Sequence, residues 1–174
     1  MRVTFPRLAD GARSYSIVER SDGVRYRVRE GVAGPSLPHD AVHFIVERGT
    51  AEDGGFWGAV AAGAVFDSMD HLDGRRPPHA QRRSEQAIRA RSDRLQRAEL
   101  MAGLVQRVAD ERITSTDQVA RAAEEALSTL PDTRVDEAKV IAAAEELREK
   151  ARFWAALAQG EKLVMEWPEK KRRK

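Results

Sequence analysis

The sequence predicts an α+β fold, in which an N-terminal antiparallel β-meander packs on a helical hairpin and is followed by a C-terminal helical region. Apolar and polar residues alternate with a period of two within the first thirty residues, which is typical of strands. From residue 38 onward, apolar residues recur mostly at helical spacing. The chain has 174 residues, a length that favours a single domain with its own core.

The strands are expected mainly at the start of the chain. Residues 24–29 alternate apolar and basic side chains, and residues 15–20 form a similar run. The Ser-Asp-Gly sequence between these two runs supplies the residues of a tight hairpin turn. A third strand is expected at residues 3–5. Residues 163–167 resemble a short strand that returns to this sheet.

Helices are expected in the remainder of the chain. Pro38 suits the first position of a helix, and Ser115 followed by Gln118 matches a capping box. The expected helices span residues 38–48, 56–71, 80–111, 115–130 and 135–159. A Gly-Arg-Arg-Pro-Pro break at residues 74–78 divides the chain into two parts. Residues 1–74 hold the meander and the hairpin, residues 75–167 a helical extension of the same domain, and residues 168–174 a disordered basic tail.

The composition excludes several classes of chemistry. The chain has no cysteine, which excludes disulfides, iron–sulfur clusters, thiolate zinc sites and cysteine nucleophiles. A bound metal would therefore need His, Asp and Glu ligands. No apolar run reaches the ~18–20 residues that a membrane-spanning helix needs, and no signal peptide is evident at the start. We expect a soluble, cytoplasmic protein with no membrane partner.

The segment LPHDAVHFIVE, residues 37–47, carries the most distinctive chemistry. On a helix, His39, Asp40, His43 and Glu47 share one face and the apolar residues take the other. Two histidines four residues apart can bind one metal ion, as in the His-Glu-x-x-His helix of zinc proteases. Glu47 lies too far along the helix to join both histidines at one ion.

The second expected helix suggests where further ligands come from. If it folds back antiparallel on the first helix, Asp67 and His71 lie beside His39 and His43. These four residues form the predicted site for a divalent metal, and Asp40 is a candidate catalytic base. A metal-dependent hydrolase is one alternative that follows, and whether the protein is an enzyme stays open.

A structural or interaction role is the more common outcome for a motif of this specificity. The histidines and the aspartate can also hydrogen bond to backbone groups and lock the junction between sheet and helix. The sequence has no Gly-x-Ser-x-Gly motif, no P-loop and no dinucleotide fingerprint.

The strings LPHDAVHFIVE and GFWGAVAAGAVFDSM resemble those of an uncharacterised family of small proteins from high-GC bacteria. The shared segments have the forms LPHDxVHFxVE and GFWGxxAxGAxF, and the similarity covers roughly residues 1–70. The resemblance implies a β-rich start followed by these two helices, which act as one structural unit. It implies no activity, because the family has no known function.

Charge is distributed in opposed blocks. Residues 75–97 hold eight basic and two acidic residues, whereas residues 98–149 hold six basic and twelve acidic residues. One interpretation is nonspecific nucleic-acid binding by the Arg-rich segment 75–97 and the basic tail. The candidate residues are Arg82, Arg83, Arg89, Arg94 and Arg97. The alternatives are ion pairs with the acidic helices of residues 116–149, or a homodimer formed through the C-terminal helices.

Overall fold

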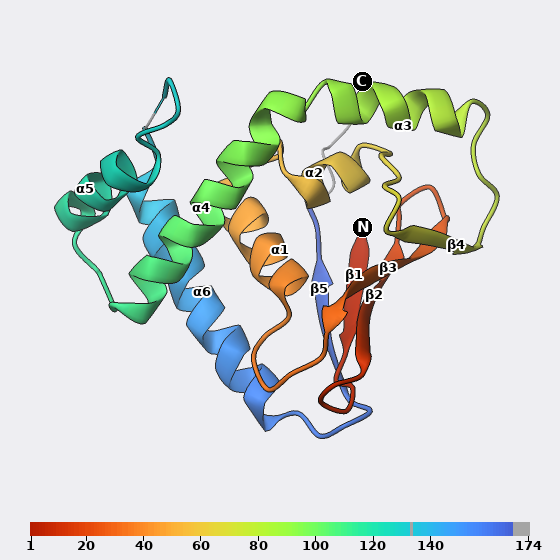
Figure 1. The fold of residues 1–174 in the computed structure, drawn as a ribbon, viewed down its shortest axis with the longest axis horizontal. Coiled ribbons are helices and arrows are strands. Elements are labelled where there is room, and N and C mark those ends of the chain that lie inside the picture. The colour runs from red at the N-terminus through yellow and green to blue at the C-terminus, as the bar shows by residue number, and fades with distance from the viewer. Residues whose placement is uncertain (133, 169–174) are drawn as a thin grey trace.

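The computed structural model describes residues 1–132 and 134–168 (Figure 1). Its sheet is antiparallel, with the strand order β4-β3-β2-β1-β5. The strands are β1 (Arg2–Pro6), β2 (Arg13–Glu19), β3 (Arg25–Val32), β4 (Met69–Asp73) and β5 (Lys162–Glu166). The helices are α1 (His39–Thr50), α2 (Phe56–Ala61), α3 (Ala80–Arg89), α4 (Ser92–Asp110), α5 (Thr116–Ala126) and α6 (Glu137–Ala156). The predicted α+β fold class is confirmed.

The sheet has one buried face, and the helices gather on that side of it (Figure 1). Side chains alternate along the strands, so that Val3, Phe5 and Val18 are buried while their neighbours are partly or fully exposed. The predicted strand near residue 163 exists as β5. It pairs with β1 over the whole of both strands, with Val3 opposite Met165. The two ends of the described chain therefore close one sheet.

Helix α1 lies at the centre of the molecule. It packs against both α4 and α6, and residues 43–47 are all buried. Phe44 of α1 meets the ring of Trp57 edge-on, at 5.4 Å between ring centres, and Phe5 of β1 meets it at 6.1 Å. The polar face of α1 is consequently turned into the protein, and each polar group on it needs a partner there.

The predicted helix over residues 56–71 is wrong beyond Ala61. Gly63 has a left-handed backbone, with φ of 107°, which ends the helix after less than two turns. Residues 69–73 form β4 instead, which pairs with β3 and leaves four of its five side chains exposed. The long antiparallel helical hairpin is therefore replaced by a short helix, a turn and an edge strand.

The single helix predicted over residues 80–111 is also wrong, because the chain breaks between α3 and α4. At the break, the guanidinium of Arg91 donates to the carbonyl oxygens of Ala87 and Asp53, both at 3.2 Å. These bonds satisfy a carbonyl near the end of α3 and attach the break to the loop after α1. None of the described helices is both long enough and apolar enough to cross a membrane.

The two helices that follow begin close to their predicted positions. Ser115 precedes α5 in an extended conformation but makes no side-chain capping bond, and α5 ends at Ala126 rather than near residue 130. Helix α6 starts after Asp136, whose carboxylate accepts a hydrogen bond from the backbone N–H of Lys139 at 3.1 Å. Val140, Leu147 and Trp154 of α6 are buried in the core.

The pairing of β5 with β1 predicts a position-specific stability pattern. Leu163 and Met165 are 4% and 3% exposed, whereas Val164 between them is 43% exposed. Leu163→Ala and Met165→Ala should each lower the free energy of unfolding by about 2–4 kcal/mol, measured by urea denaturation. Val164→Ala, the matched control, should cost under about 1 kcal/mol. Equal costs at all three positions would contradict this sheet register.

Candidate metal centre

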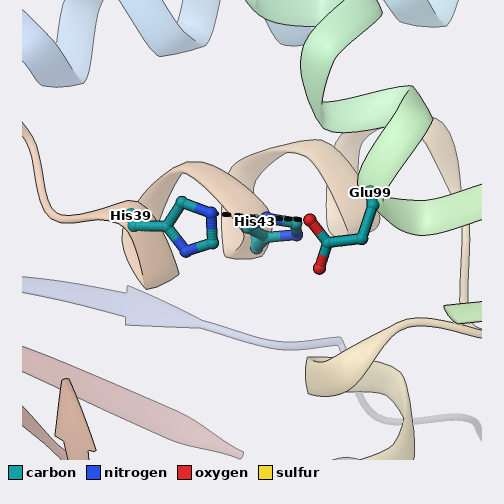
Figure 2. A group of neighbouring side chains, drawn as sticks. All are labelled: His39, His43 and Glu99. Atoms are coloured by element: carbon teal, nitrogen blue, oxygen red, sulfur yellow. Dashed lines mark hydrogen bonds and ion pairs between the residues drawn. The ribbon is translucent and has the colours of Figure 1, made fainter. Parts of the chain in front are cut away.

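Two histidines of α1 and one glutamate of α4 bring their ligand atoms together (Figure 2). His39 Nε2 lies 3.2 Å from His43 Nε2, and His43 Nε2 lies 3.4 Å from Glu99 Oε2. One ligand atom from each of the three residues lies within 4.8 Å of the others, and no other such group comes together in the described part of the chain. These three side chains are called the His39–His43–Glu99 cluster below.

The spacing of the cluster suits a tetrahedral metal ion. Ligand atoms bound ~2.0–2.1 Å from zinc at tetrahedral angles are ~3.3–3.4 Å apart. The two short separations in the cluster, 3.2 and 3.4 Å, are close to this value. The longest separation must shorten, and Glu99 can provide this movement because its side chain is 66% exposed.

Hydrogen bonds alone satisfy the cluster poorly. The same atom, His43 Nε2, is the near neighbour of both His39 and Glu99. A neutral imidazole nitrogen either carries one hydrogen or offers one lone pair, so it cannot donate to both neighbours fully. A cation at the meeting point would accept lone pairs from all three ligand atoms at once.

Asp40 orients the first histidine of the cluster. Its Oδ1 lies 3.4 Å from His39 Nδ1, which favours a hydrogen on Nδ1 and leaves Nε2 as the ligand. Burial raises the pKa of Asp40, and hydrogen bonding and charge from His39 oppose that shift. Asp40, the predicted catalytic base, therefore lies next to the cluster rather than within it.

Burial also prepares His43 for a metal. The residue is 6% exposed, and this burial lowers the pKa of its imidazole, an effect that the nearby Glu99 carboxylate opposes. A metal binds only the neutral imidazole, so the lowered pKa reduces competition from protons. The side chain of His39 is 76% exposed, so the cluster has a buried inner ligand and an open outer side.

The structure does not bring Asp67 and His71 to the two histidines of α1. The backbone carbonyl of Asp67 accepts a hydrogen bond from Arg29, and Asp67 precedes the edge strand β4. His71 lies on β4, where its Nε2 is 3.0 Å from the Gly74 carbonyl oxygen and its ring meets Tyr26 edge-on at 5.7 Å. The predicted four-residue site required a helix that ends too early.

Glu99 is the ligand that the sequence reasoning missed. It lies one residue after the buried Ala98 and two before the buried Met101, on the half-exposed border of α4. No spacing relates it to residues 39–43, because only the packing of α4 across α1 brings it there. The available signal was its position beside the apolar stripe of a helix.

Glu47, the last polar residue on this face of α1, has a different role. It is 1% exposed, and its Oε2 accepts a hydrogen bond from the backbone N–H of Gly58 at 3.0 Å. The carboxyl group thus caps the start of α2. Gly55 makes room for it, since a Cβ there would lie 2.3 Å from the carboxyl carbon. Burial raises the pKa of Glu47 to about 8, although the N–H groups of α2 oppose this shift.

The arginines proposed for nucleic acid fall into two groups. Arg97 forms an ion pair with Glu52 at 2.9 Å, and Arg94 forms one with Asp53 at 3.6 Å. Both acids belong to the loop after α1, not to the acidic helices that the sequence suggested. Arg82, Arg83 and Arg89 lie exposed on α3. The acidic helices pair with other arginines, including Arg107 with Glu125 and Arg48 with Glu146.

Comparison with known proteins gave no match: no family model, no curated protein and no solved structure is similar to this chain. The function is therefore argued from geometry and chemistry alone.

The raised pKa of Glu47 predicts how stability depends on pH. Its folded-state pKa of about 8 exceeds the ordinary value of 4.5, so the folded state holds the proton more tightly. Stability should therefore fall as pH rises from about 4.5 toward about 8, by linkage. Glu47→Gln keeps a carbonyl acceptor and cannot ionise, so its urea midpoint should depend less on pH than that of the wild type.

Two further variants make this prediction specific. Glu47→Ala removes both the cap and the packing, and should cost about 2–4 kcal/mol throughout this pH range. Glu124→Gln, at an exposed position on α5, should keep the wild-type pH profile. Glu30, whose pKa burial raises to about 7, contributes the pH dependence that remains in Glu47→Gln. An unchanged profile in Glu47→Gln would contradict the assignment to Glu47.

Proposed function

We propose that the protein binds one divalent transition-metal ion, with zinc as the best fit, through His39, His43 and Glu99. The observation that carries the proposal is the convergence of two imidazole nitrogens and one carboxylate oxygen at zinc-like separations. Asp40 supports it as the outer partner of His39, in the arrangement common to metal-bound histidines.

The ligand types favour zinc and its neighbours over magnesium or calcium. Imidazole nitrogen suits Zn²⁺, Ni²⁺, Fe²⁺ and Cu²⁺, whereas Mg²⁺ and Ca²⁺ prefer oxygen ligands alone. The absence of cysteine removes the thiolate ligands that dominate structural zinc sites. Three protein ligands of this kind are typical of zinc sites that keep a fourth position for water or substrate.

Metal-dependent hydrolysis is the activity that this ligand set would support. The outer side of the cluster is exposed through His39 and Glu99, which leaves room for water beside the ion. A zinc-bound water loses its proton near neutral pH, and a nearby carboxylate such as Asp40 can accept it. A structural or interaction role, in a cytoplasmic protein without metal, is the alternative that this proposal replaces if an ion binds.

Metal content tests the proposal directly. Untagged protein incubated with Zn²⁺ and freed of excess ion should retain about one zinc per chain, measured by elemental analysis. The double variant His39→Ala/His43→Ala should retain none. Glu99→Gln and Asp40→Asn should weaken binding, Asp40→Asn by about 10–100-fold.

His71→Ala is the matched control for this experiment. It removes a histidine that lies on β4 and outside the cluster, so zinc binding should stay at the wild-type level. Zinc binding that persists in His39→Ala/His43→Ala, or no zinc in the wild-type protein, would refute the site.

Nucleic-acid binding remains an alternative proposal, supported by the exposure of Arg82, Arg83 and Arg89 on α3. The ion pairs of Arg94 and Arg97 with the loop after α1 reduce the charge left for phosphates. If the alternative holds, labelled random duplex DNA should bind at about 50 mM salt and lose at least tenfold in affinity near 200 mM. The variant Arg82→Gln/Arg83→Gln should weaken this binding. No binding at low salt would end this alternative.

A homodimer through the C-terminal helices also remains a proposal. Phe153 on α6 is 48% exposed and supports it as a candidate apolar contact. Light scattering after size exclusion should then give twice the chain mass of 19.4 kDa, and a monomer mass at all concentrations would rule it out.

A further inference from the structure

A cavity of about 400 Å³ lies between the sheet, the start of α1 and the end of α6. Its wall includes Ser14 of β2, Glu30 of β3, Asp40 of α1 and Trp154 of α6, together with the loop of residues 31–38. Small-molecule sites usually measure ~300–1,000 Å³, so this cavity can hold a small ligand. His39 of the cluster also borders it, but the argument below requires no metal.

The charged side of the cavity is acidic. Glu30 and Asp40 both line it, and no Lys or Arg does. The Ser14 hydroxyl donates to Glu30 Oε2 at 3.2 Å, but Glu30 Oε1 is buried and has no hydrogen-bond partner among the described residues. Burial, together with the charge of Asp40, raises the pKa of Glu30 to about 7. A cation in the cavity would relieve the repulsion between the two carboxylates.

The opposite wall presents an unused donor. Trp154 is 2% exposed, and its Nε1–H is buried without an acceptor within residues 1–132 and 134–168. Buried indole N–H groups usually find a partner, so this one indicates an acceptor that arrives with a ligand. This unpartnered donor is independent of the two carboxyl groups.

The nearest arginine leaves this site acidic. The Arg7 guanidinium lies 5.5 Å from the centre of the Trp154 ring and is not part of the cavity wall. It is held by the Gly34 carbonyl oxygen at 2.8 Å and the Asp10 carboxylate at 3.2 Å. Apolar side chains complete the wall and leave room for a short carbon chain; they are Val32, Pro35, Leu37 and Pro38.

We propose that this cavity binds a small organic cation, an amine that also carries a hydroxyl or carbonyl oxygen. The ammonium group lies between Glu30 and Asp40, and the oxygen accepts the hydrogen of Trp154 Nε1. The short chain between these groups lies against the apolar loop of residues 31–38.

Calorimetric titration of the EDTA-treated full chain at about pH 8, where Glu30 is ionised, tests the proposal. The probe is aminobutanol. Butanediol lacks its charge, hydroxybutyrate reverses it, and butylamine lacks the oxygen. Aminobutanol should bind once per chain, about tenfold or more tightly than butanediol or hydroxybutyrate, and severalfold more tightly than butylamine.

Two variants assign the contacts. Glu30→Gln should weaken aminobutanol binding about tenfold, while the exposed control Glu124→Gln should leave it unchanged. Trp154→Phe should reduce aminobutanol to the affinity of butylamine and leave butylamine itself unaffected. No binding of aminobutanol, equal affinity for butanediol, or full affinity in Glu30→Gln would overturn the proposal. EDTA treatment keeps these outcomes separate from those of the zinc experiment.

Discussion

The buried carboxyl group of Glu47 is the constraint on which the arrangement of this structure depends. It joins the central helix α1 to α2 by accepting the backbone N–H of Gly58. The join requires Gly55 without a Cβ and places Trp57, whose Nε1 donates to the Asp40 carbonyl oxygen at 2.8 Å. The Gly-Phe-Trp-Gly sequence is thus explained by one buried group and the ring that packs beside it.

The same constraint determines what the rest of α1 can do. Because α1 is enclosed by the sheet, α4 and α6, its polar face cannot be left to solvent (Figure 1). The C-terminal part of that face is satisfied by α2, and the N-terminal part by Glu99 of α4, which lies beside His43. A metal ion would complete the second arrangement as the backbone of α2 completes the first. Next to it, the cavity below Asp40 keeps polar atoms without partners among the described residues.

The sequence was informative where the pattern is local and uninformative where packing decides. The first three strands, β5 and the helix at residue 39 follow from periodicity and were predicted close to their observed positions. Strand β4 was missed because an exposed edge strand shows no apolar alternation, and its residues suited a helix equally well. His39 and His43 follow from i,i+4 spacing, but Glu99 is brought by tertiary packing that no spacing encodes.

X-ray absorption at the zinc edge of the zinc-loaded protein tests this account most directly. The account predicts two imidazole nitrogens at about 2.0–2.1 Å and carboxylate or water oxygen at about 2.0–2.2 Å around a single zinc ion. The imidazole signal should disappear in His39→Ala/His43→Ala and persist in His71→Ala. A first coordination sphere made only of oxygen, or an imidazole signal that survives the double substitution, would contradict the account.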